Sequence, residues 1–287
     1  MRHYITAAIF VLATYLFAWA GSAGSVDIFG MPGTVSLFLL TFAMQYALFI
    51  PSYLMRTEKF FDISGSLTFI AVIGLAYYRI ESASDIQKIL AAMIGVWTVR
   101  LGIFLFARVL NDGGDRRFSE IRLSFPRFLV SWSLQGAWVY IVSSPAIFIL
   151  TRSSVDTYID LFTYIGCGLW ALGFIVETVA DIQKRVFRNN PLNSSAFITT
   201  GLWSVSRHPN YLGEIVLWTG LTVVTLPFLV GWELVAILSP VFTYLLLTRV
   251  SGINLLEEHA ESKWGDMDLY IEYRSKTPKL FPFSRGE

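Results

Sequence analysis

The residues best suited to chemistry gather in the second half of the chain, and the first group is a row of charges. Glu177, Asp181, Arg185 and Arg188 follow one another at intervals of four, four and three residues. At 100° per residue these side chains fall within an arc of about 80°, so they form one polar stripe on a helix. Carboxylates are costly inside a membrane span. We therefore expect the stripe to line a functional cavity, and its four residues are candidates for a cofactor site. A snorkelling helix end with ion pairs on its solvated side is the alternative for Arg185 and Arg188, but it fits Glu177 poorly.

A second group lies in Ser206-Arg-His-Pro-Asn-Tyr-Leu-Gly-Glu214. Proline suits the first position of a helix, so Arg207 and His208 are predicted beside a helix N-terminus. The free N–H groups and positive dipole end there favour an anion such as a cofactor phosphate. An interfacial anchor explains Tyr211 equally well. The candidate cofactor-binding residues of this stretch are Arg207, His208, Asn210, Tyr211 and Glu214.

A third group follows the last apolar stretch of the chain. Asn254, Glu257, Glu258 and Glu261 share one helical face. An amphipathic helix lying on the membrane accounts for much of this pattern without any catalysis. If the helix completes the cofactor site, the residues that contribute are Asn254, Glu257, Tyr273 and Arg274.

The first half of the chain offers three candidate catalytic residues. Asp62 precedes Ser64-Gly-Ser66 where a span begins, and Gln135 and Tyr140 lie inside a later span. A buried glutamine or tyrosine more often satisfies an interhelical hydrogen bond than touches substrate. Asp62 is the better candidate, because it is an acid held near the membrane boundary.

Several other classes of site are excluded by residue types. The chain has only three histidines, and no spacing repeats as metal ligands require, so no metal site is predicted. The single cysteine, Cys167, lies in an apolar run, so no intrachain disulfide forms and a buried structural role is expected. Gly166, Gly168 and Gly173 have no strand before them, so they indicate close helix packing and not a nucleotide-binding βαβ unit.

Composition shows which elements must position these groups. The 287 residues are 54% hydrophobic and only 15% charged, which is typical of a chain that lies in a bilayer. The net charge of +1 gives no reason to expect a nucleic-acid partner. Eight windows are apolar enough to span, although Pro227 interrupts the seventh and leaves seven spans plus a half-helix as an alternative. The windows are approximately residues 4–20, 34–55, 63–78, 89–110, 128–150, 159–180, 211–230 and 234–250.

The connecting loops predict the topology. Every even-numbered span is followed by basic residues, whereas the loop 21–33 after the first span has neither Lys nor Arg. Because short cytoplasmic loops collect basic residues, both termini are expected in the cytoplasm, and the first span is expected to be retained rather than cleaved as a signal peptide. We predict an all-α membrane protein with a single catalytic domain. Residues 1–128 would be its substrate side and residues 129–287 its cofactor-binding half.

The stretch from Ser206 to Glu214 resembles the steroid 5α-reductase superfamily, and its bacterial branch in particular. Further support comes from Phe60–Thr68, from Gly114-Asp-Arg-Arg-Phe118, from Glu177–Asp181 running into Arg188, and from Arg249–Glu257. The likeness covers nearly the whole chain and is strongest in the C-terminal half. A member of the bacterial branch would lie in the bacterial inner membrane.

The resemblance implies reduction of the carbon–carbon double bond of an enone, such as a 3-oxo-Δ4 steroid, by NADPH held in a cytosol-facing membrane cavity. It places Asp181, Arg188, Asn210 and Glu214 at cofactor-binding positions, and Asp62 near a glutamate that polarises the substrate carbonyl. The expected partners are therefore a hydrophobic small molecule and the lipid bilayer.

Two other functions remain open. The Arg-His-Pro-x-Tyr pattern also resembles membrane isoprenylcysteine and phospholipid methyltransferases, which bind S-adenosylmethionine. We favour the reductase because Arg188 and Arg207 are suited to bind phosphate groups, which NADPH has and S-adenosylmethionine lacks. A non-enzymatic lipid carrier is the third possibility, and it would leave the polar stripe unexplained.

Overall fold

The computed structural model describes residues 1–112, 118–152 and 159–283, with side chains except at 106–112. It is 78% helical with almost no strand. Within the described residues, eight helical stretches are long and apolar enough to cross a membrane. The predicted all-α membrane fold with eight spans is confirmed. The predicted Gly114–Arg117 stretch of the family resemblance lies outside the described residues.

The chain divides into two compact units, residues 1–163 with 221–239, and residues 164–220 with 240–287. The helices of the first unit are α1 (Arg2–Ala20), α2 (Gly33–Leu54), α3 (Phe61–Tyr78), α4 (Asp85–Asp112) and α5 (Phe125–Leu150), with short 3-10 helices at Ile121–Leu123, Leu226–Phe228 and Gly231–Ile237. The helices of the second unit are α6 (Leu161–Asn189), α7 (Pro209–Thr225), α8 (Leu238–Leu245), α9 (Ile253–Trp264) and α10 (Asp268–Lys276). Helices α6, α7 and α8 each extend by a few residues into the first unit. The prediction of a single catalytic domain stays a prediction.

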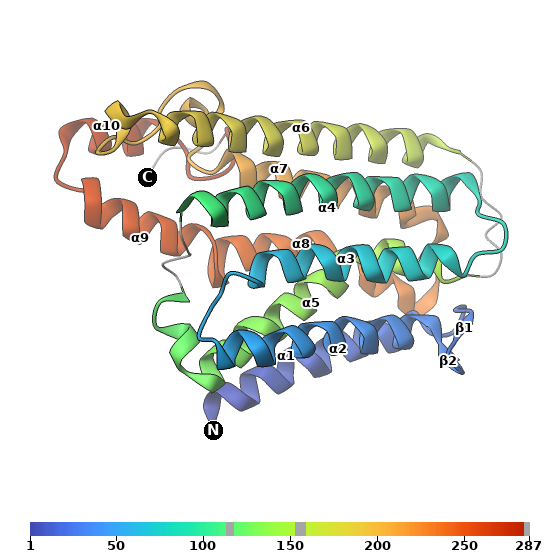
Figure 1. Cartoon of the computed structure of the whole chain (residues 1–287). Helices are drawn as coiled ribbons and strands as arrows, with labels where there is room; N and C mark the ends of the chain where they lie inside the picture. The colour runs from blue at the N-terminus through green and yellow to red at the C-terminus, as the bar shows by residue number, and fades with distance from the viewer. Residues whose placement is uncertain (113–117, 153–158, 284–287) are drawn as a thin grey trace. The chain divides into compact units, whose positions relative to one another are not determined.

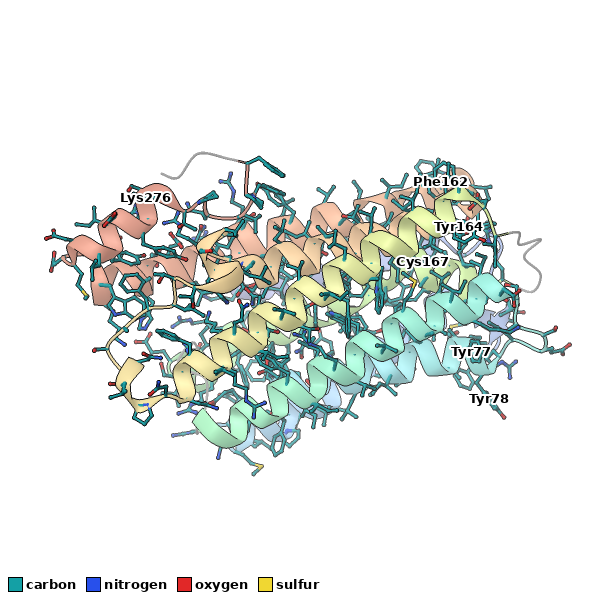
Figure 2. All side chains as sticks on the ribbon, turned by 90° about the horizontal axis from the view of Figure 1, so that it is seen from above. Tyr77, Tyr78, Phe162, Tyr164, Cys167 and Lys276 are labelled. Carbon is teal, nitrogen blue, oxygen red and sulfur yellow. The ribbon has the colours of Figure 1, made fainter. Side chains whose placement is uncertain are left out.

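Helix α5 is the core of the first unit. It contacts α1, α2, α3 and α4, and 89% of its most apolar window is buried. In Figure 1, α1 and α2 run side by side along this unit. Figure 2 shows Tyr77 and Tyr78 together at one end of α3, where Tyr78 is 82% exposed. Exposed tyrosines at a helix end are typical of a membrane–water interface.

A short hairpin closes one end of the first unit. Strands β1 (Asp27–Ile28) and β2 (Met31–Pro32) pair antiparallel around Phe29 and Gly30. Both turn residues have positive φ, 58° and 76°, as a type I′ turn requires. Arg152 follows α5 and pairs with Ser25, just before the hairpin. Its guanidinium forms an ion pair with Glu233 and donates a hydrogen bond to the carbonyl of Phe228. This pair ties the end of α5 to residues 226–237.

The last two spans differ from the sequence prediction in detail. Helix α7 ends at Thr225, and Pro227 lies in a separate 3-10 turn, whereas the sequence predicted a span running to Val230. Proline removes a backbone donor and so interrupts the α-helical ladder there. The final span begins as a 3-10 helix at Gly231–Ile237 and ends in a π-helix at Leu246–Val250. The single amphipathic helix expected after it is two helices, α9 and α10.

Candidate functional site

Helices α6 and α7 of the second unit pack with their backbones in contact. A Cβ atom added to Gly173 would lie 2.5 Å from both the carbonyl oxygen of Gly213 and the amide nitrogen of Leu217. A Cβ added to Gly213 would lie 2.5 Å from the amide nitrogen of Glu177. The expected role of small residues is thus confirmed for Gly173. It is wrong for Gly168, where an added Cβ would meet nothing within 4 Å.

This crossing positions the predicted polar stripe. Glu177 and Asp181 are 4% and 7% exposed, although they lie in a spanning helix. The side-chain amide of Asn210, at the start of α7, donates to the Asp181 carboxylate at 3.3 Å. Arg185 and Arg188 lie further along α6 and are exposed. The α6 stripe therefore has a buried acidic part that reaches α7 and an exposed basic part at the helix end.

The segment between α6 and α7 forms hydrogen bonds with α6 and with α10. The indole N–H of Trp203 donates to the carbonyl of Ala180 at 3.1 Å, and the hydroxyl of Tyr273 donates to the carbonyl of Trp203 at 2.6 Å. Phe197 packs against the rings of Tyr273 and Trp264. In Figure 1, α9 and α10 lie around the C-terminal end of α6. The loop that carries Arg207 and His208 is therefore held by side chains of α10.

Arg207 and His208 meet on one carboxylate, that of Glu257 in α9. The Glu257 carboxylate lies 3.0 Å from a guanidinium nitrogen of Arg207 and 2.8 Å from Nε2 of His208. The two basic side chains are only 3% and 7% exposed, and that of Glu257 is 20% exposed. Tyr211 stacks on the imidazole of His208. Residues from two groups that were predicted separately thus form one cluster at the start of α7.

The cluster has unused hydrogen-bonding capacity. Within the described part of the chain, none of the three guanidinium nitrogens of Arg207 has a hydrogen-bond acceptor, because the ion pair with Glu257 lacks hydrogen-bond alignment. Nδ1 of His208 is likewise buried without a partner among the described residues. Buried polar groups are nearly always satisfied, so such a group needs an explanation such as a missing ligand. The guanidinium nitrogens of Arg207 are hydrogen-bond donors suited to an anionic group.

The protonation of His208 decides what its free nitrogen can do. Burial lowers the pKa of His208 below the ordinary value of 6.5, and this effect outweighs the hydrogen bond to Glu257, which raises it. The imidazole is therefore neutral at pH 7. A neutral ring whose Nε2–H donates to the carboxylate leaves Nδ1 as an acceptor. The cluster thus combines the N–H donors of Arg207, suited to an anion, with an acceptor suited to a hydroxyl or N–H group.

The remaining candidates of the second unit differ in burial and in their partners. Tyr273 is half-buried, and burial raises the pKa of its phenol well above the ordinary value. Arg274 is paired with Glu261 at 2.5 Å, Glu214 is half-buried, and Asn254 is exposed. Sequence reasoning overlooked Ser206 as a structural residue. Its hydroxyl donates to the carbonyl of Leu280 and accepts from the N–H of His208, a link that no local spacing could reveal.

The candidate catalytic residues lie in the first unit. The Gln135 amide donates to the carbonyl of Phe61 and accepts from the hydroxyl of Ser64, so both of its ends are used. The Tyr140 hydroxyl donates to the carbonyl of Thr34 and is fully buried. Asp62 is half-buried in the first turn of α3. Cys167, expected to be buried, is half-buried on α6, where Figure 2 shows it.

The fold and this cluster define a multi-pass membrane protein with a buried cluster of arginine, histidine and glutamate at the entrance of a spanning helix. Residues 48–277 match the family described as a protein of unknown function, DUF1295. The chain belongs to this family, which is part of the steroid 5α-reductase superfamily.

Individual relatives are distant. A probable O-methyltransferase of Ustilaginoidea virens is 32% identical over 71 residues, 25% of each chain. An uncharacterized protein of Schizosaccharomyces pombe is 23% identical over 73% of this chain and 66% of its own length. A Delta(14)-sterol reductase of Arabidopsis thaliana is 25% identical over 30% of this chain and 23% of its own. The chain thus spans at most 66% of the length of these relatives. No solved structure is significantly similar to the chain.

Proposed function

We propose that this protein is a membrane reductase that uses NADPH to reduce the carbon–carbon double bond of an enone in a hydrophobic substrate such as a 3-oxo-Δ4 steroid. The observation that carries the proposal is the Arg207 guanidinium, 3% exposed and without a hydrogen-bond acceptor among the described residues. A guanidinium fork beside a helix N-terminus suits a phosphate group. Family membership and the resemblance to sterol reductases support reduction as the reaction.

The residues of the second unit would hold the cofactor. Arg207 would donate to a phosphate, and Nδ1 of His208 would accept from a hydroxyl, such as one on a ribose. Glu257 keeps both side chains in place before binding, at 3.0 Å and 2.8 Å. Asp181 and Asn210, linked at 3.3 Å, would orient the remaining polar part. NADPH, when bound, would supply the hydride.

The substrate would be polarised by residues of the first unit. A carbonyl oxygen gains negative charge when hydride adds at the β-carbon, and a positioned donor in a water-poor cavity stabilises it. Asp62 is the candidate donor that the resemblance indicates. Gln135 and Tyr140 would have to release their present acceptors, the carbonyls of Phe61 and Thr34, before they could donate to a substrate. Both termini would face the cytoplasm, on the side of the basic loops.

The experiment that tests this proposal is a binding titration of the purified full-length protein with NADPH and with S-adenosylmethionine. We expect NADPH to bind and to raise the Tm, and S-adenosylmethionine to do neither. A hydrogen bond to a charged group contributes about 1.5–3 kcal/mol, so Arg207→Gln should raise the Kd for NADPH by about 10- to 100-fold. Arg79→Gln, which removes an exposed arginine at the end of α3, is the matched control.

Each alternative function has its own outcome in this titration. Binding of S-adenosylmethionine without NADPH would reject the reductase and favour a methyltransferase, the activity named for the Ustilaginoidea virens relative. Binding of neither would favour a lipid carrier. NADPH affinity in Arg207→Gln equal to that in Arg79→Gln would show that the site is misplaced. When binding is confirmed, oxidation of NADPH in the presence of a panel of enones identifies the substrate class.

A further inference from the structure

The β1–β2 hairpin of the first unit holds an aromatic residue in a backbone conformation that aromatic residues seldom adopt. Phe29 has a φ of 58°, in the left-handed region, where a bulky side chain is an outlier. Asn, Asp and Gly are the residues that a type I′ turn prefers at this position. Phe29 is 79% exposed, so its contacts with the described residues offset little of this strain. An outlier of this kind calls for a functional explanation.

The hairpin is fixed to the rest of the first unit, although its turn is exposed. Ile28, the residue before the turn, is 1% exposed. The carbonyl of Ile28 accepts a hydrogen bond from the hydroxyl of Ser36 at 2.6 Å. The backbone N–H of Val26 donates to the carbonyl of Thr151, at the end of α5, at 2.6 Å. These contacts hold the turn, and with it Phe29, in one position relative to α2 and α5.

The hydrogen bond to Ser36 shows how deep Phe29 lies along the spanning helix α2. This helix begins at Gly33 and has 22 residues, so Ser36 lies in its first turn. At 1.5 Å per residue α2 is about 33 Å long, close to the roughly 30 Å of the hydrocarbon core, so its first turn lies near the edge of that core. Consecutive Cα atoms are about 3.8 Å apart, and the headgroup region on each side of the core is about 5–8 Å thick. Phe29 directly follows the Ile28 carbonyl that Ser36 binds, so it falls within the headgroup region.

Two exposed tryptophans belong to the same end of the first unit. Trp19, in the last turn of α1, is 54% exposed, and Trp232 is 76% exposed. Trp232 lies in the 3-10 helix Gly231–Ile237, which contacts both α1 and α5. Figure 1 shows the hairpin next to the ends of α1 and α2. Because tryptophan rings gather at membrane–water interfaces, their presence supports the same depth for this end of the unit.

We propose that Phe29 is an interfacial anchor, whose ring the β1–β2 hairpin lays among the headgroups and upper acyl chains of the lipid leaflet at this end of the first unit. Removal of the ring from water would offset the strain of the turn. A stable interface with another protein buries about 800 Å² on each partner. This turn offers a single ring between Asp27 and Gly30, which are both exposed, so lipid fits it better than a protein partner does. The proposal concerns the first unit alone and does not depend on the reductase proposal.

The test asks what touches the ring when the full-length protein is in phosphatidylcholine liposomes. Photoreactive benzoylphenylalanine replaces Phe29, which keeps an aromatic side chain at the turn, and mass spectrometry identifies the adduct after irradiation. The control carries the same residue in place of Ser82, which is exposed in the polar loop between α3 and α4. We expect an adduct with the mass of one phospholipid at position 29 and its loss at position 82. Equal lipid adducts at the two positions, or an adduct of position 29 with a second protein chain, would overturn the proposal.

A second measurement gives the depth of the turn and does not require the photoreactive residue to fold. The chain has a single cysteine, so Cys167→Ser provides a background in which Phe29→Cys or Ser82→Cys carries one bimane label. Lipids with a spin label on the headgroup should quench the label at position 29 more than that at position 82. Iodide in the water should show the opposite order. Stronger quenching by iodide at position 29 than at position 82 would place the turn in water and overturn the proposal. Binding of NADPH should be unchanged in both variants, so failure here leaves the reductase proposal standing.

Discussion

The crossing of α6 and α7 provides a sharp test of the architecture that supports the site. In Gly173→Ala the new methyl carbon would lie 2.5 Å from Gly213 O and Leu217 N, and 2.9 Å from Leu217 Cα. Ordinary contacts begin near 3.4 Å. Overpacking costs about 1–3 kcal/mol, and the upper part of this range, about 2–3 kcal/mol, applies here because backbone atoms cannot rotate away as side chains can. Alanine regains about 1 kcal/mol of helix propensity, so we expect a net loss of about 1–2 kcal/mol.

The matched control is on the same helix. In Gly168→Ala the added carbon meets nothing within 4 Å, so this variant should gain helix propensity without a clash. A change of 1 kcal/mol shifts the Tm of a chain of 150–250 residues by about 2–4 °C. The Tm of detergent-purified Gly173→Ala should therefore lie about 2–8 °C below that of the parent, and that of Gly168→Ala at or above it. Equal Tm values for the two variants would show that α6 and α7 do not touch at Gly173.

Three further perturbations follow from the described contacts. Asp181→Asn keeps a hydrogen-bond acceptor at this position but removes its charge, so the Kd for NADPH should rise about three- to tenfold while expression stays unchanged. Binding as tight as in the parent would place Asp181 outside the site. Folding favours the neutral form of His208, so the contribution of this residue to stability is complete above the ordinary pKa of 6.5 and is lost as the pH falls below it. The Tm of the parent should therefore drop below pH 6.5, and the drop should be smaller in His208→Gln. A loss of stability confined to higher pH would contradict the assignment. Glu233→Gln leaves the Arg152 guanidinium, which is 15% exposed, without its carboxylate, so the free energy of unfolding should fall by about 2–4 kcal/mol. Glu272→Gln removes an exposed carboxylate and is the control, which should change the Tm little.

Sequence patterns predicted the membrane fold because its signal is local. A span needs only a long apolar run, and all eight windows are apolar along most of their length. The ends of the spans were less predictable. The π-helix at Leu246–Val250 and the 3-10 helix at Gly231–Ile237 contain no residue type that distinguishes them from an α-helix. Their hydrogen-bond pattern depends on neighbouring elements, so hydropathy alone does not reveal it.

Residue types in the candidate site were predictable, but their partners were not. The helix N-terminus and the adjacent Arg207 and His208 could be predicted because proline and the basic pair are neighbours in sequence. The Glu257 carboxylate that joins them comes from α9, and only the folded chain brings it to 3.0 Å and 2.8 Å. Burial also changes the role expected of His208. The sequence predicted a contact with a phosphate, whereas the buried ring is neutral and its Nδ1 is a hydrogen-bond acceptor.

The position of Glu257 also bears on how a buried arginine can be kept ready for a ligand inside a membrane protein. A buried guanidinium without a counter-ion is very costly, and one whose five N–H groups were all bonded within the protein would have no donor left for a phosphate. In this cluster the carboxylate is 3.0 Å from the Arg207 guanidinium yet is not aligned for a hydrogen bond. It therefore stabilises the charge while the N–H groups remain available. Glu257→Gln would keep the shape and remove that charge, so it should lower the Tm of the free protein more than that of the protein saturated with NADPH. Equal losses in the two states would mean that Glu257 only supports the fold.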